Sequence, residues 1–224
     1  MQSFRLTLAN QSTVQGAHSI PSQPSLPVEH RPLIVALHGG CYDHQYFDAL
    51  PKYSASVLSE ALGVPFVAID RPSYGGTSSV LPISSGSDFK RETAIRLHHF
   101  ILPKVWEEFS VSHGCTCIVL LCHSLGVMSS TVVSSLHRQD KRPLYPLGGL
   151  IASSLGDEPP PAPRVRLPPY PRIGSNHALC PLKSKDAVML KPSTYAPEML
   201  GQSERLNAPI PVAEFGALED WMLI

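Results

Sequence analysis

One stretch constrains the fold more than any other: an apolar run, residues 118–122, is followed directly by His123-Ser124-Leu125-Gly126. Five apolar residues without a polar break are too few for a typical helix and favour a buried strand. Apolar residues then recur at a helical spacing that puts them on one face, at Leu125, Met128, Val132 and Leu136. The pattern predicts a strand, a sharp turn at Ser124 and a helix.

Such a turn has chemical consequences for Ser124. It lifts the hydroxyl clear of the sheet, and the helix that starts below it presents free N–H groups to developing negative charge. Gly126 suits the turn because a side chain there would collide with the preceding strand. Cys122 stands where the usual pattern has glycine, and it is still a small residue. The alternative is a buried strand followed by an ordinary serine helix cap.

Two further apolar strands end in residues that suit a site. Residues 33–37 lead into His38-Gly39-Gly40, and residues 64–69 lead into Asp70 and a loop rich in glycine and serine. The backbone N–H of Gly40 is a candidate donor into a cleft, with a plain turn at the strand end as the alternative. Asp70 is a candidate catalytic carboxylate, but we favour a role in tying its loop together through hydrogen bonds.

The remaining elements complete an α/β pattern. We expect an edge strand at residues 4–8, a turn and a second edge strand within 11–32, helices over 46–62 and 88–109, and a central strand at 147–154. Pro103 should kink or divide the second helix near Leu102. This alternation predicts a mostly parallel, doubly wound sheet with helices on both faces. His38, Asp70 and Ser124 then share the carboxyl edge of the strands, where ligands bind in such sheets.

Composition excludes several classes of function. The chain has 224 residues and a formal net charge of zero, which argues against a nucleic-acid partner. No stretch approaches the length of a membrane span, and no signal peptide is recognised. The sequence has five cysteines, an odd number, and they form no paired CxxC framework. This pattern indicates a reduced compartment, so we expect a cytoplasmic protein. No cofactor or metal is expected, because His98 and His99 have no acidic or cysteine partner at metal spacing.

The character of the sequence changes after residue 156. Residues 157–171 are rich in proline and are best explained as an extended connector, and short helices are expected at 184–189 and 197–206. We therefore predict two regions, an α/β core over residues 1–156 and a cap or lid with a truncated C-terminus over 157–224.

Together, these motifs resemble the α/β-hydrolase superfamily in its serine esterase branch. The resemblance spans roughly residues 30–155 and rests on the His38-Gly39-Gly40 strand end, the Asp70–Ser78 loop and the Cys122–Gly126 elbow, in that order. It implies that Ser124 is the nucleophile and that the N–H groups of Gly40 and Leu125 form the oxyanion hole. It further implies hydrolysis of an ester or thioester of a small apolar metabolite, such as one of secondary metabolism, through an acyl-enzyme. An acyltransferase that uses the same serine is an alternative.

The chain departs from the family where the base is expected. In this family the acid and then the histidine follow the serine. After Ser124 the sequence has only His137, on the far end of the helix, and His177, in the cap; Glu219 is a weak candidate for the acid. The C-terminal strands and the triad histidine are therefore expected to be missing. A catalytically weak accessory or binding protein is the second hypothesis, and an exposed sheet edge makes oligomers a further expectation.

Overall fold

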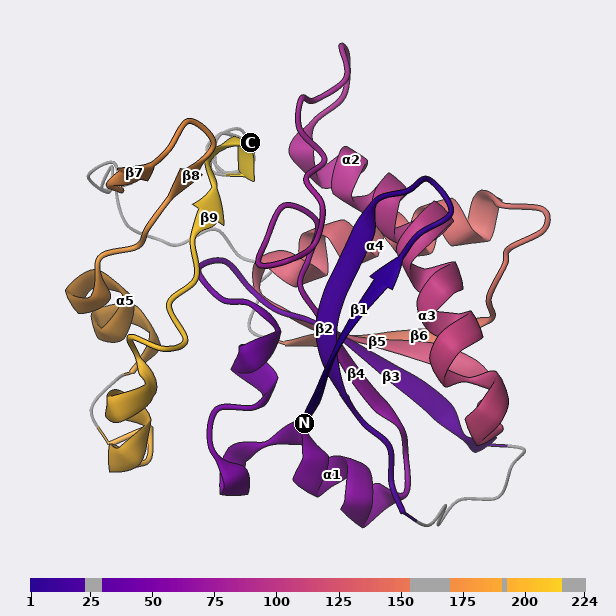
Figure 1. The fold of residues 1–224 in the computed structure, drawn as a ribbon, viewed down its shortest axis with the longest axis horizontal. Helices are drawn as coiled ribbons and strands as arrows, with labels where there is room; N and C mark the ends of the chain where they lie inside the picture. The colour runs from indigo at the N-terminus through magenta and orange to yellow at the C-terminus, as the bar shows by residue number, and fades with distance from the viewer. Residues whose placement is uncertain (23–29, 154–169, 191–192, 215–224) are drawn as a thin grey trace.

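A six-stranded sheet forms the centre of the molecule (Figure 1). The computed structural model describes residues 1–22, 30–153, 170–190 and 193–214. The strands lie in the order β1-β2-β4-β3-β5-β6. Their bounds are β1 Gln2–Thr7, β2 Thr13–Ser19, β3 Pro32–Leu37, β4 Phe66–Ile69, β5 Cys117–His123 and β6 Leu147–Ser153.

The sheet is mostly parallel, as the sequence predicts. Strands β4, β3, β5 and β6 run parallel to one another, whereas β1 and β2 form an antiparallel pair that joins the sheet through β4. Two expectations about position are wrong. Strand β2 lies between β1 and β4 and is not at an edge, and β6 is the outer strand of the described sheet and not a central one.

One face of the sheet is covered by a layer of helices (Figure 1). They are α2 Phe89–Arg96, the π-helical turn η4 Leu97–Ile101, α3 Leu102–Phe109 and α4 Leu125–Gln139, with the short 3-10 turn η5 Val111–His113 after α3. The π turn ends at Ile101, two residues before Pro103, and the N–H of Leu102, which follows the turn, bonds to the carbonyl of Leu97. Because proline lacks an N–H and crowds the carbonyl four residues earlier, a widened turn accommodates it. The predicted irregularity near Leu102 is confirmed.

Among the described residues, the other face carries one α-helix, α1 Ala55–Leu62, which contacts β2 and β4. The prediction of one continuous helix over residues 46–62 is wrong. That segment breaks into two 3-10 turns, η2 His44–Phe47 and η3 Pro51–Tyr53, before α1 begins. Pro51 starts η3, and the Ser54 hydroxyl accepts the N–H of Ser56, so Ser54 caps α1 and fixes its start. Gly63 ends the helix in the left-handed conformation, as expected.

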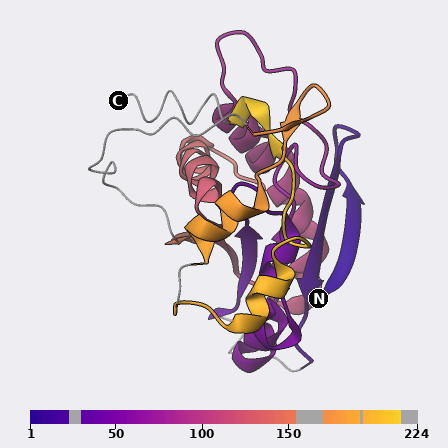
Figure 2. The same cartoon turned by 90° about the vertical axis from the view of Figure 1, so that its left-hand side faces the viewer.

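The C-terminal segment forms a layer beside the carboxyl edge of the sheet, orange to yellow in Figure 1 and facing the viewer in Figure 2. It contains α5 Leu182–Met189, the 3-10 helix η6 Pro197–Gln202 and a small antiparallel sheet of β7 Arg172–Ile173, β8 His177–Ala178 and β9 Ile210–Pro211. The two expected short helices are thus present. Most of the expected connector, residues 157–169, lies outside the described residues, and so does the predicted boundary at 156. No helix in the described part of the chain is long and apolar enough to cross a membrane.

Candidate active site

The turn between β5 and α4 holds Ser124 in an unusual backbone conformation. Its φ is 49° and its ψ is −120°. A positive φ is uncommon for a residue with a side chain, and this ψ lies outside the left-handed helical region. Such a conformation costs roughly 1–3 kcal/mol and persists only where the surrounding structure imposes it. The strain therefore marks Ser124 as a residue held in place by its neighbours.

The neighbours of Ser124 hold it from both sides. Its N–H donates to the carbonyl of Ser153 in β6 (2.8 Å), and its own carbonyl accepts the N–H of Val127 in the first turn of α4 (2.9 Å). A Cβ on Gly126 would lie 2.7 Å from the carbonyl oxygen of Leu37. Glycine is therefore required for close approach, as expected, but the strand it approaches is β3 and not the preceding strand β5. The strained turn is thus tied to three elements.

The loop after β3 lies directly against this turn. A Cβ built on Gly39 would be 3.0 Å from the Cβ of Ser124, and one built on Gly40 would be 2.8 Å from Cδ1 of Leu125. Leu125 is the first residue of α4, where N–H groups have no carbonyl partner within the helix. The structure therefore brings together the three residues that the sequence singles out, Gly40, Ser124 and Leu125.

Buried polar groups fix the loop on the Gly39 side. The carbonyl of Gly39 accepts Nδ1–H of His38 (2.7 Å) and a guanidinium N–H of Arg71 (3.2 Å), while Nε2 of His38 accepts the backbone N–H of Arg71 (3.0 Å). Arg71 also forms a two-pronged ion pair with Glu214 (2.6 and 3.2 Å), whose carboxylate accepts the hydroxyl of Tyr74 as well. All four side chains are buried.

These contacts define the charge states. Burial, and then the positive charge of Arg71, hold the pKa of His38 well below its usual value, so its ring is neutral. Burial by itself would lower the pKa of the Arg71 guanidinium. The charge and hydrogen bonds of its partners, chiefly Glu214, outweigh burial, and the net shift of this pKa is upward. The residue that completes this pair, Glu214, comes from the C-terminal segment, far along the chain from Arg71.

A second buried cation fixes the loop beyond Gly40. The ammonium of Lys185 donates to the carbonyl of Cys41 (3.0 Å), the carbonyl of Leu206 (2.8 Å) and Oδ1 of Asn207 (3.2 Å). It also lies 3.9 Å from the ring centre of Tyr42. Burial lowers the pKa of Lys185 to about 8. The loop that contains Gly40 is therefore held on both flanks by residues of the C-terminal segment.

Asp70 has the tying role that the sequence favoured. One carboxylate oxygen accepts the backbone N–H of His44 (2.9 Å) and lies 2.6 Å from its Nδ1, and the other oxygen accepts the N–H of Gly76 (3.0 Å). Burial alone would lower the pKa of His44, but the hydrogen bond to Asp70 and the negative charges of Asp70, Asp43 and Asp48 together outweigh it, and the net shift is upward. One carboxylate oxygen thus holds the start of η2, and the other holds the loop that begins at Asp70.

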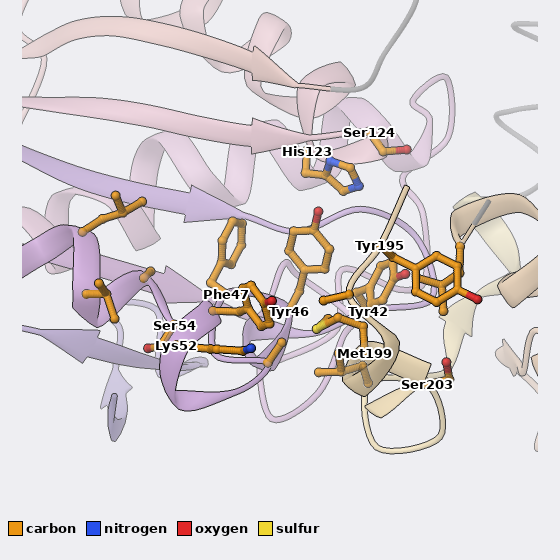
Figure 3. Close-up of a pocket in the computed structure, with 18 of the residues that line it drawn as sticks. Tyr42, Tyr46, Phe47, Lys52, Ser54, His123, Ser124, Tyr195, Met199 and Ser203 are labelled. Atoms are coloured by element: carbon orange, nitrogen blue, oxygen red, sulfur yellow. The ribbon is translucent and has the colours of Figure 1, made fainter. Parts of the chain in front are cut away.

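No histidine in the described ranges forms a hydrogen bond with the hydroxyl of Ser124. The ring of His123 stacks on Tyr46 (4.7 Å between centres), and the Ser124 oxygen points away from that ring in Figure 3. Nε2 of His137 donates to the carbonyl of Tyr145, about 18 Å along α4 from the serine. Nε2 of His177 donates to the carbonyl of Ser73. Glu219 lies outside the described residues.

A cavity of about 1030 Å³ opens at Ser124 (Figure 3). Its walls are mainly aromatic and aliphatic and come from four places: the strand ends, the loop with η2, helix α1 and the C-terminal segment. They include Tyr42, Tyr46, Phe47, Phe66, Leu121, Val57, Leu58, Tyr195 and Met199. Three charged residues also line it: Lys185, which is engaged as described, Lys52, which pairs with Glu198, and Asp186. The lining is therefore mostly apolar.

Sequence reasoning missed Arg71, Glu214 and Lys185. Arg71 lies inside a loop that the sequence did single out, so its neighbourhood was visible although its role was not. Glu214 and Lys185 carry no local signal, because each acts on a loop more than 140 positions away in the sequence. Only the folded chain reveals these pairs.

Comparisons with known proteins identify one family and several similar solved structures. The profile of the Alpha/beta hydrolase family matches residues 34–224, whereas no curated protein matches the chain. Similar solved structures include the juvenile hormone epoxide hydrolase of the silkworm Bombyx mori (14% identity, TM-score 0.47). Two others are the Aspergillus niger epoxide hydrolase (15% identity, TM-score 0.43) and a hyperthermophilic esterase of the archaeon Pyrobaculum calidifontis (15% identity, TM-score 0.41).

The matches cover 70%, 73% and 62% of this chain but only 32%, 37% and 39% of those proteins, in the same order. The chain thus spans about a third to two fifths of their length. The family profile, by contrast, extends over most of the chain and includes both the strand end at His38 and the elbow at Ser124. The chain belongs to the alpha/beta hydrolase family.

Proposed function

We propose that the protein is a serine hydrolase that cleaves an ester or thioester of a small apolar metabolite through an acyl-enzyme. Ser124 is the nucleophile, and the N–H groups of Gly40 and Leu125 stabilise the oxyanion. The observation that carries the proposal is the strained backbone of Ser124, with φ 49° and ψ −120°, beside the glycine loop. Strain of this kind gathers at functional sites, and a helix cap would not need it.

The proposed chemistry follows from these positions. The Ser124 oxygen attacks the carbonyl carbon of the ester, and the negative charge that develops on the carbonyl oxygen is stabilised by the two N–H groups. The alcohol or thiol then leaves with a proton, and water releases the acid from the serine. The apolar cavity beside Ser124 supports an apolar acyl group as the part of the substrate that binds there.

The second candidate is a catalytically weak binding or accessory protein. It is favoured by one observation: within the described ranges, no histidine side chain bonds to the Ser124 hydroxyl. A serine without a general base loses several orders of magnitude in rate in triads of this kind. The two candidates share the cavity and differ in the reactivity of the serine.

Hydrolysis of p-nitrophenyl esters with acyl chains of increasing length separates the candidates. We expect hydrolysis above the background rate that rises with chain length, and loss of at least 90% of it in Ser124→Ala. Ser135→Ala, an exposed serine on the same helix, is the matched control and should keep full activity. Equal rates for the wild type and Ser124→Ala would contradict the proposal and favour the binding protein.

A further inference from the structure

A cluster of histidines and a carboxylate lies at the far end of α4 from Ser124. His98 and His99 are in the π-helical turn η4, and Asp140 directly follows α4. One potential ligand atom from each of the three residues lies within 4.8 Å of the others. An acidic partner for the two histidines could not be recognised in the sequence, because Asp140 reaches them only through the packing of the two helical segments.

The imidazole of His98 is buried and incompletely satisfied. Its side chain is 2% exposed, and its Nδ1 lies 2.9 Å from the hydroxyl of Tyr145. Its Nε2 has no hydrogen bond, although Oδ2 of Asp140 is 3.3 Å away. Buried polar atoms are nearly always bonded, so an unbonded ring nitrogen aimed at a carboxylate calls for an explanation.

We propose that Nε2 of His98, a ring nitrogen of His99 and Oδ2 of Asp140 form a binding site for a divalent transition-metal ion of the zinc type. Two atoms that each lie about 2.0–2.1 Å from one tetrahedral zinc ion are about 3.3 Å apart. That is the separation between Nε2 of His98 and Oδ2 of Asp140. Imidazole nitrogens with one carboxylate are a ligand set that such ions prefer.

Neighbouring groups orient both ligands as the outer partners of metal ligands do. When Nδ1 of His98 donates to Tyr145, the lone pair of Nε2 is directed toward Asp140. The other oxygen of Asp140 accepts the backbone N–H of Arg142 (2.9 Å), which leaves Oδ2 for the ion. Nε2 of His137 already donates to the carbonyl of Tyr145 (2.9 Å), so His137 is not counted among the ligands.

A second group of possible ligands, Asp43, His44 and Asp70, has a different character. There Nδ1 of His44 is 2.6 Å from Asp70, and both oxygens of Asp70 accept backbone N–H groups. Oδ1 of Asp43 accepts the backbone N–H of Gln45 (2.8 Å), so all three residues of this group have hydrogen bonds within the protein. The contrast with the unbonded Nε2 of His98 is what selects the first cluster.

Calorimetric titration of the chelator-treated, reduced protein with Zn²⁺ tests the proposal. We expect one equivalent to bind, and we expect the dissociation constant to rise at least roughly tenfold in both His99→Ala and Asp140→Asn. These two side chains are not in the buried core, so the variants should fold even if His98→Ala does not. His113→Gln, which removes a partly exposed histidine outside the cluster, is the matched control and should bind as the wild type does.

Titration with Co²⁺ distinguishes this site from the cysteines. Ligation by nitrogen and oxygen gives visible absorption bands without the strong near-ultraviolet band of a cobalt–thiolate bond. Absence of Zn²⁺ binding, equal affinity in His99→Ala and Asp140→Asn, or a thiolate band would each overturn the proposal. So would loss of binding in His44→Ala with binding retained in His99→Ala.

Discussion

The two faces of the central sheet are packed in different ways. On the face toward α2, α3 and α4, side chains such as Val35, Leu37 and Leu120 are fully buried in one large apolar cluster. On the face toward α1, the buried cluster is small, Leu121 is only partly buried and Ile151 is 50% exposed. Adjacent residues of one strand, Leu120 and Leu121, therefore lie in different surroundings.

This difference in packing between the two faces shows how the residues around Ser124 are held in place. The closely packed face anchors β5 and α4, the two elements that meet at Ser124. The open face provides the room for the cavity, and there polar contacts take over from apolar ones. The ion pair of Arg71 with Glu214 and the bonds of Lys185 fix the loop that contains Gly40. One side of the site thus depends on apolar packing and the other on buried charge.

The largest expected effect tests the buried charge. Glu214→Ala removes the partner of the buried Arg71 guanidinium and should lower the free energy of unfolding by about 3–5 kcal/mol. Glu204→Ala, an exposed glutamate of the same segment, should change it by less than about 0.5 kcal/mol. Urea denaturation measures both. Equal, small effects would mean that the C-terminal segment does not hold the loop.

A pair of substitutions in β5 tests the comparison between the faces directly. Leu120→Ala should lower the free energy of unfolding by about 2–5 kcal/mol, because it leaves a cavity in the closely packed face. Leu121→Ala should cost about 1 kcal/mol, because its side chain already borders the open cavity. The difference in urea denaturation between the two variants is the quantity of interest. Equal losses would show that the second face is packed as closely as the first.

The cap of α1 should have a smaller effect. Ser54→Ala removes the hydroxyl that accepts the N–H of Ser56 and should lower the free energy of unfolding by about 1 kcal/mol. Ser54→Gly should restore most of that loss, since glycine is tolerated at this position. Thermal unfolding of the two variants checks the order. If glycine proved worse than alanine, the hydroxyl would not be acting as a cap.

The smallest effect concerns His123, on the open face. Burial lowers its pKa below the ordinary 6.5, so just below pH 6.5 the unfolded chain binds more protons at this residue than the folded chain does. This residue therefore makes stability rise with pH up to about 6.5 and has no further effect above it. His123→Gln should flatten that rise, as seen by urea denaturation between pH 5 and 7.5. An unchanged slope would mean that the ring is freely solvated.

The sequence predicted most of the sheet because each core strand is a short apolar run with its own end signals. It also predicted that His38, Asp70 and Ser124 lie at one edge, since parallel strands end there, and the family resemblance implied that Gly40 and Leu125 lie beside Ser124. It failed at residues 46–62, where apolar spacing suggested one helix but Pro51 and Ser54 impose breaks.

The residues that hold the loop containing Gly40 could not be predicted from the sequence, for a different reason. Glu214 and Lys185 contact residues that are distant in the sequence, and their own surroundings show no pattern that points to a buried charge. The same holds for Asp140 beside His98. Side-chain contacts between separate elements are set by the packing of the whole chain, which local periodicity does not encode.

The reactivity of Ser124 is the central claim, and covalent labelling by a fluorophosphonate with peptide mass spectrometry tests it most directly. We predict that the folded protein gains one label on the peptide that contains Ser124, and that Ser124→Ala gains none. Labelling that is absent from the folded wild-type protein, or that falls on another serine, would contradict the claim.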